Sequence, residues 1–125
     1  MVNIKRQLVS QSVVNKRSYG TANPINSITI HQTGNTNKGA NAQAHANIQT
    51  NLNPREASWH YQVNDKEIIQ SFEDKVQCWH ATDGRGPGNL TSIAVEICII
   101  SVGDYKKALQ NTADIIKYLM DKSIS

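Results

Sequence analysis

The sequence predicts an α/β domain in which a mixed central β-sheet is flanked by helices. Its length of 125 residues suits one domain built around one core. Short segments rich in β-branched and aromatic residues alternate with two segments of helical periodicity, which is typical of this fold class. One segment, residues 91–100, is almost continuously apolar, as in a strand buried on both faces. We therefore expect residues 1–125 to form a single domain.

The first half of the chain predicts an arm, a strand and a helix. Residues 1–26 are expected to be irregular, because Gly20 and Pro24 lie among polar residues. Residues 27–32 predict a strand, since β-branched residues occupy its centre. Residues 39–52 predict a helix, because apolar residues recur at every fourth position and a proline follows shortly after.

The second half predicts a hairpin, two further strands and a long helix. Residues 58–72 alternate around a tight turn and predict a hairpin. Residues 76–81 predict a short strand, and the glycine-rich residues 82–89 predict a loop. Residues 91–100 predict the buried strand and 104–121 a helix capped by Asp104. The apolar stripe expected on this helix comprises Tyr105, Ala108, Leu109, Ala113, Ile116, Leu119 and Met120.

Charge and hydropathy exclude several classes of partner. The net charge is +3, and the basic residues are spread along the chain without a dense block interleaved with aromatics, so we expect no nucleic-acid partner. A mild positive field suits a polyanion such as a bacterial wall. No apolar segment approaches the length of a membrane span, and the N-terminal residues lack the apolar core of a signal peptide. Cys98 is expected to be a small buried hydrophobe, with a disulfide to Cys78 as the alternative.

Two residues stand out chemically. His31 ends the strand at 27–32, where an imidazole is either a hydrogen-bonded edge residue or a metal ligand. Glu96 lies inside the most apolar strand, where burial is costly unless the carboxylate is paired, and where burial raises the pKa towards neutrality. Glu96 is therefore either an acid–base group or a carboxylate paired with a lysine or a backbone donor.

The other three histidines carry weaker signals. His80 precedes the glycine-rich loop and is expected to line a site. His60 is expected to be a hydrogen-bonded histidine of the sheet, and His45 a surface or packing residue of the helix. No closely spaced zinc motif is present, and a catalytic zinc needs about three protein ligands. His31, His60 and His80 could lie close together in the folded chain, but their spacing in the sequence does not show this.

Four ordered blocks give the chain a resemblance to a known family. They read ITIHQTGNT, SWHYQVNDKEIIQSF, CWHATDGRGPGNLTSIAVEICI and GDYKKALQNTADIIKYLM. Together, over about residues 1–122, they resemble the zinc-dependent N-acetylmuramoyl-L-alanine amidases of the amidase-2 family, above all endolysins of phages and prophages of Gram-positive bacteria. The resemblance implies a fold like that of the peptidoglycan-recognition proteins. It also implies hydrolysis of the amide bond between N-acetylmuramic acid and L-alanine.

The resemblance assigns roles residue by residue. His31 matches the family's first zinc ligand, and Glu96 matches the acidic residue that acts as catalytic base or stabilises the transition state. Residues matching the wall of the substrate groove are Trp79, His80 and Asn89. Some relatives carry a catalytic tyrosine where this chain has Trp59, so a tyrosine-based mechanism is not expected.

The family's other two zinc ligands follow its last helix, on a further strand and loop that this domain is expected to lack. Only His31 matches a ligand, so the isolated chain is expected to bind zinc poorly. Three hypotheses remain: a truncated amidase, an amidase in which His80 or a second chain replaces the ligands, and a non-catalytic peptidoglycan-binding module. The expected partner is bacterial peptidoglycan, with self-association through an exposed sheet edge. The expected location is the cytoplasm until release onto the cell wall.

Overall fold

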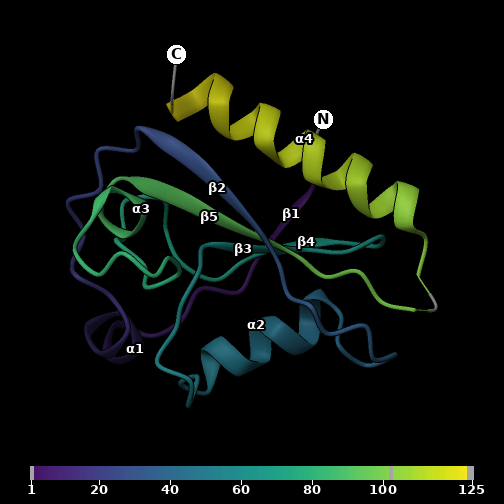
Figure 1. The fold of residues 1–125 in the computed structure, drawn as a ribbon, viewed down its shortest axis with the longest axis horizontal. Helices are drawn as coiled ribbons and strands as arrows, with labels where there is room; N and C mark the ends of the chain where they lie inside the picture. The colour runs from purple at the N-terminus through teal and green to yellow at the C-terminus, as the bar shows by residue number, and fades with distance from the viewer. Residues whose placement is uncertain (1, 102, 124–125) are drawn as a thin grey trace.

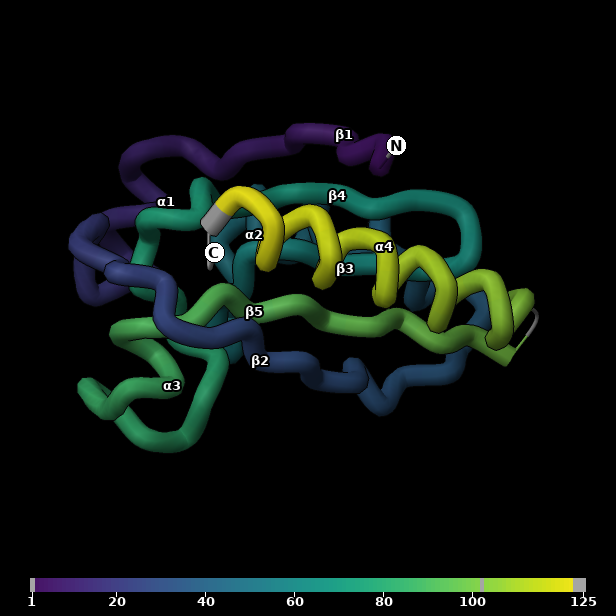
Figure 2. Tube along the Cα trace, turned by 90° about the horizontal axis from the view of Figure 1, so that it is seen from above, coloured from purple at the N-terminus to yellow at the C-terminus, as the bar shows by residue number. Residues whose placement is uncertain are grey.

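The computed structural model describes residues 2–101 and 103–123, which form one five-stranded sheet between helices (Figure 1). In spatial order the strands are β1 (Ile4–Arg6), β4 (Ile68–Gln70), β3 (Tyr61–Val63), β5 (Ser92–Ile97) and β2 (Ser27–Gln32). Figure 2 shows them side by side in this order. Only the β3–β4 pair is antiparallel; β1–β4, β3–β5 and β2–β5 are parallel. The predicted mixed sheet is confirmed.

Helices cover both faces of the sheet. The long helix α4 (Tyr105–Ser123) lies across one face, and α1 (Gln11–Lys16) and α2 (Ala42–Thr50) lie on the other (Figure 1). The predicted helix at 39–52 is confirmed as α2, and the hairpin at 58–72 as the β3–β4 pair. The single-turn helix α3 (Pro87–Leu90) interrupts the predicted loop, since a proline favours the first helical position. Among the described residues, no helix has the length and apolarity needed to cross a bilayer.

The core between α4 and the sheet is apolar. Its buried members are Tyr61, Val63, Ile68, Ile93, Val95, Ile115 and Leu119. On α4 the buried row is Ala108, Thr112, Ile115 and Leu119. The predicted stripe was therefore wrong for four residues that are exposed, Tyr105 (by 54%), Leu109, Ala113 and Met120, and Ile116 is only partly buried. The apolar residues of α4 occupy more than one face, and only the row that meets the sheet is buried.

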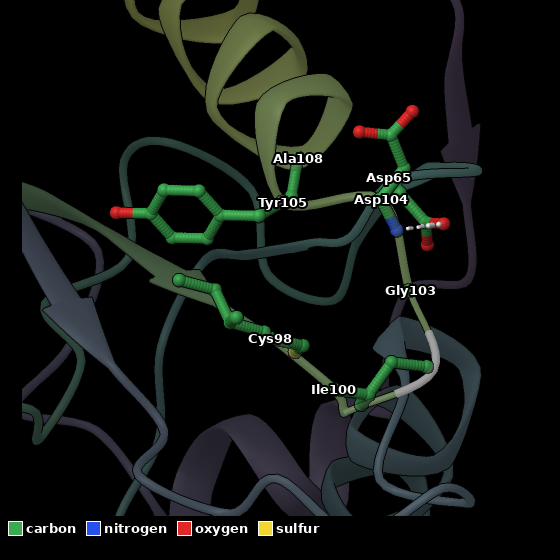
Figure 3. A pocket seen from close by; sticks show the side chains of 8 residues that line it. Asp65, Cys98, Ile100, Gly103, Asp104, Tyr105 and Ala108 are labelled. Carbon is green, nitrogen blue, oxygen red and sulfur yellow. Dashed lines mark hydrogen bonds between the residues drawn. The ribbon is translucent and has the colours of Figure 1, made fainter.

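The turn into α4 is held by two aspartates. Asp104 caps the helix as predicted, since its side chain accepts a hydrogen bond of 3.1 Å from the backbone N–H of Lys107. The Asp65 carboxylate, from the β3–β4 turn, accepts a hydrogen bond of 2.9 Å from the backbone N–H of Asp104 (Figure 3). Cys98 is buried beneath this turn, and both Cys78 and Cys98 are free thiols, so the disulfide alternative is wrong.

Two expectations about local structure fail. Residues 1–26 are not wholly irregular, because they contain β1 and α1. Strand β1 has only three residues and takes its conformation from pairing with β4, far along the chain. The strand expected at 76–81 is reduced to one bridge between Ser18 and Cys78. In the described part of the chain, β2 has no neighbour on its outer side, and self-association through this edge stays a prediction.

Candidate active-site groove

A groove of about 420 Å³ lies on the α2 side of the sheet, where parallel strands β2 and β5 end. The carboxyl ends of parallel strands are a common place for ligand sites, because side chains from neighbouring strands converge there. Among the residues that line it are His31 from β2, Glu96 from β5, His45 from α2, and Arg55, Trp59 and His80 from the connecting segments.

Glu96 lies at the centre of a row of side chains that crosses the sheet. It is the register partner of His31 on β2 and of Gln62 on β3, so these three side chains share the face that carries the groove. Its carboxyl group has no hydrogen-bond partner among the described residues. Burial raises the pKa of Glu96 to about 7, and the charge of Arg55 opposes this shift. The alternative of a paired carboxylate is not what the structure shows.

His31 and His80 face each other across the groove floor. The distance from His31 Nε2 to His80 Nδ1 is 3.1 Å, and that from His80 Nε2 to Ser92 Oγ is 3.1 Å. Ser92 donates its only hydroxyl proton to the carbonyl of Gly88, so it accepts from His80 Nε2–H. His80 Nδ1 therefore carries a lone pair, and His31 Nε2–H donates to it. This tautomer follows from the hydrogen-bond network.

Burial keeps this imidazole pair neutral. Desolvation, with a smaller effect of the neighbouring imidazoles of His60 and His31, lowers the pKa of His80 to about 4. Burial also lowers the pKa of His31 below its ordinary value. Neutral imidazoles are the form that binds metals. Here the two facing nitrogens share one proton in a hydrogen bond, so they could serve as two metal ligands only after His31 moves its proton from Nε2 to Nδ1.

The described residues do not complete a zinc site. Tetrahedral catalytic zinc takes about three protein ligands and a water. Across residues 2–101 and 103–123, no group of three or more His, Cys, Asp or Glu side chains is arranged to hold a metal ion. The facing nitrogens of His31 and His80 supply two donors at most, so the residues present do not fit a complete zinc centre.

A buried polar network holds Trp59 in the groove wall. Gln62 Oε1 accepts hydrogen bonds from Trp59 Nε1 at 2.6 Å and from Gln49 Nε2 at 3.1 Å. Gln62 Nε2 donates to the carbonyl of Ile69 and to Ser71 Oγ. The Gln49 amide also bonds both backbone groups of Trp59. Because the side-chain amides of Gln49 and Gln62 have hydrogen-bond partners, the network holds α2, Trp59 and β3 together as a rigid wall of the groove.

His60 is a structural residue that does not line the groove, and its ring centroid lies 6.5 Å from that of His80. It is fully buried; its Nδ1 accepts from the Ala94 N–H at 3.0 Å, and its Nε2–H donates to the Val76 carbonyl at 2.7 Å. Desolvation lowers its pKa to about 4. The expectation of a hydrogen-bonded histidine of the sheet is confirmed.

Of the three residues assigned to the substrate wall, only His80 lines the groove. Asn89 is 2% exposed, and its amide holds the adjoining loop through bonds to His80 N, Ala81 N, Ala81 O and Gly84 O. Trp79 packs against Tyr19, with ring centroids 5.7 Å apart, and its indole N–H is buried without a partner among the described residues. Direct substrate contact by Trp79 and Asn89 stays a prediction.

Two lining residues were missed by the sequence analysis, His45 and Arg55. His45 is 9% exposed and donates from Nδ1 to the carbonyl of Asn41 at 2.9 Å. Its position one turn into α2, directly after the polar loop that follows His31, was the only available signal. No sequence pattern around Arg55 indicated a role in a site, because its position in the groove depends on how the loop after α2 folds back.

Comparisons with known proteins identify the family of the chain. The family model of N-acetylmuramoyl-L-alanine amidase, Amidase_2, matches residues 21–125. The chain is 41% identical over 124 residues to the N-acetylmuramoyl-L-alanine amidase CwlH of Bacillus subtilis, covering 98% of this chain and 48% of that protein. It is 42% identical to the amidase XlyA of the same organism, covering 96% of this chain and 39% of XlyA. The chain thus spans less than half the length of these curated relatives.

Solved structures agree with the sequence relatives. A mutant endolysin from Bacillus subtilis is similar with a TM-score of 0.91 and 41% identity, covering 98% of this chain and 78% of that one. The catalytic domain of XlyA has a TM-score of 0.90 and 39% identity, with the same coverage. The sheet order and the helices on both of its faces are therefore those of an endolysin catalytic domain, and the chain belongs to the amidase-2 family of N-acetylmuramoyl-L-alanine amidases.

Proposed function

We propose that this chain acts on bacterial peptidoglycan and hydrolyses the amide bond between the lactyl group of N-acetylmuramic acid and L-alanine. The observation that carries the proposal is the unpartnered carboxyl group of Glu96, which lines the groove beside the imidazoles of His31 and His80. Family membership supplies the substrate class. The site of action in this proposal is the cell wall, reached from the cytoplasm after release.

Glu96 is the proposed proton-transfer group. A carboxyl group with a pKa of about 7 is available in both protonation states near neutral pH. In the proposal it accepts a proton from the attacking water and delivers it to the leaving amine of L-alanine. Trp59 supplies a rigid apolar wall, and His80 binds substrate at the groove floor, while Asn89 holds the loop that carries His80. Trp79 stays in the proposal as part of the outer wall.

Zinc enters the proposal only through the family resemblance, with His31 as its one matched ligand. No step above is routed through the metal, because the described residues do not assemble three ligands. The same observation favours a second candidate function, a peptidoglycan-binding module that keeps the groove without catalysis.

Purified Gram-positive sacculi separate the two functions. Under the amidase proposal, incubation releases new N-terminal alanine without new reducing sugar ends, and Glu96→Gln stops the release. Under the binding proposal, sacculi retain the chain above a charge-matched control protein, and no alanine terminus forms. Retention no better than the control, with no new termini, contradicts both.

A further inference from the structure

Arg55 is the permanent cation of the groove. Among its described lining residues, Arg55 is the only lysine or arginine and Glu96 the only aspartate or glutamate. A guanidinium stays protonated at any physiological pH. The groove therefore combines the carboxyl group of Glu96, on the sheet, with the fixed positive charge of Arg55, on the loop after α2.

The guanidinium of Arg55 has no partner of its own. Its side chain makes no ion pair or hydrogen bond to any residue in the described ranges, although the neighbouring Glu56 carries a carboxylate. Its five N–H donors form a planar fork that matches the two oxygens of a carboxylate. Arg55 and Glu96 line the same groove, so a ligand in it lies within reach of both groups.

The loop that presents Arg55 is held in a fixed shape. Leu52 and Glu56 have φ angles of 65° and 53°, a left-handed conformation that non-glycine residues adopt at a cost of about 1 kcal/mol or more. Asn53 is buried, and its side-chain oxygen accepts from the backbone N–H of Arg55 at 3.0 Å. Its carbonyl accepts from Nε of Arg17 at 3.1 Å and from Nη2 at 2.9 Å. Arg55 is therefore mounted on a pre-organised support.

We propose that Arg55 recognises a free carboxylate of the stem peptide, on the amine side of the scissile bond. The inference rests on the proposed function, because it takes the groove to be the muramoyl-peptide site. The sugar units beside the scissile bond are uncharged, so the anions in reach of the groove belong to the peptide. The chain then selects peptidoglycan whose stem-peptide carboxylate is free over peptidoglycan in which it is amidated.

Binding measurements test this without requiring turnover. Two synthetic muramoyl peptides are compared, alike except that the residue after L-alanine carries a free carboxylate in one and a carboxamide in the other. Isothermal titration calorimetry is run on the wild-type chain, on Arg55→Gln, and on Lys106→Gln as a control. Lys106 lies on α4, across the sheet from the groove, and its substitution removes the same charge from an exposed position. Urea unfolding confirms that each variant is folded.

The wild-type chain is expected to bind the carboxylate peptide at least about tenfold more tightly, the effect of one charge-assisted hydrogen bond. Arg55→Gln is expected to reduce this ratio to within about twofold, and Lys106→Gln to leave it unchanged. Three results would each overturn the inference. They are equal affinities of the wild-type chain for the two peptides, an Arg55→Gln variant with the wild-type ratio of affinities, and no binding of either peptide. Selective binding without hydrolysis of sacculi instead contradicts the amidase reaction and leaves recognition by Arg55 intact.

Discussion

His31 Nε2 and His80 Nδ1 lie 3.1 Å apart, with His31 at the end of β2 and His80 in the segment between β4 and α3. The contact fixes the proton of His31 on Nε2, because His80 Nε2–H already donates to Ser92 Oγ and His80 Nδ1 is left as an acceptor. The two facing nitrogens therefore share one proton in a hydrogen bond near Glu96, and the described residues contain no group of three or more side chains arranged to hold a metal ion.

The first prediction concerns the metal. A chain with two convergent imidazoles should bind zinc weakly, because stable protein sites use about three ligands or more. Elemental analysis of purified protein is expected to give well below one zinc per chain after dialysis. A stoichiometric zinc that only a chelator removes contradicts this expectation and calls for a third ligand.

The second prediction concerns Glu96. Its replacement by Gln keeps the shape of the side chain and removes proton transfer, which contributes about 10²- to 10⁴-fold in general acid–base catalysis. Release of alanine termini from sacculi is expected to fall by at least about 100-fold, with unfolding stability retained. Glu73→Gln, an exposed carboxylate paired only with Lys75, serves as the matched control. An unaffected rate in Glu96→Gln removes this residue from the mechanism.

The third prediction concerns His60 and pH. Its folded-state pKa of about 4 lies below the value of about 6.5 in an unfolded chain. The stability that the protein gains from keeping His60 neutral is fully present above about pH 6.5. It is lost as the pH falls towards 4, because His60 of the unfolded chain takes up a proton before His60 of the folded chain does. Each pH unit in this window lowers the free energy of unfolding by about 1.4 kcal/mol. NMR should show a neutral His60 with its proton on Nε2 at about pH 5; titration near 6.5 contradicts the assignment.

The fourth prediction concerns Asn89. Its side chain supplies two acceptor and two donor contacts to the loop that carries His80, so removing it leaves several backbone groups unpaired. Asn89→Ala is expected to lower the free energy of unfolding by about 2–4 kcal/mol, the scale of broken buried hydrogen bonds. Asn15→Ala, at an exposed position of α1, should change it by less than about 0.5 kcal/mol. Similar values for the two variants contradict the loop-holding role.

Most of the fold was predictable because its signals are local. The alternation in residues 58–72 and the continuous apolar run of β5 each reflect burial of that segment, so the β3–β4 pair and β5 were found. Strand β1 was missed because its residues, Ile4–Arg6, carry no pattern of their own and depend on pairing with β4. The buried face of α4 was misjudged because its apolar residues surround much of the helix.

The candidate site was predictable where a residue conflicted with its surroundings. Glu96 stood out as a charge in an apolar strand, and the structure leaves its carboxyl group unpaired in the groove. His45 and Arg55 suit their own segments and acquire a role only when α2 and its following loop fold over the sheet. Asn89 was assigned to substrate by resemblance, whereas its hydrogen bonds depend on backbone geometry that no sequence pattern records.

The most direct measurement maps a muramoyl peptide onto the chain by NMR. On titration with the free-carboxylate peptide, we expect the largest chemical-shift changes at groove residues His31, Trp59, His80 and Glu96. A larger hollow of about 610 Å³, beside Asp74 and Lys122 on the α4 side, should be unaffected. Shift changes centred on Asp74 and Lys122, or none at saturating peptide, would contradict the proposal that this groove is the site of action on peptidoglycan.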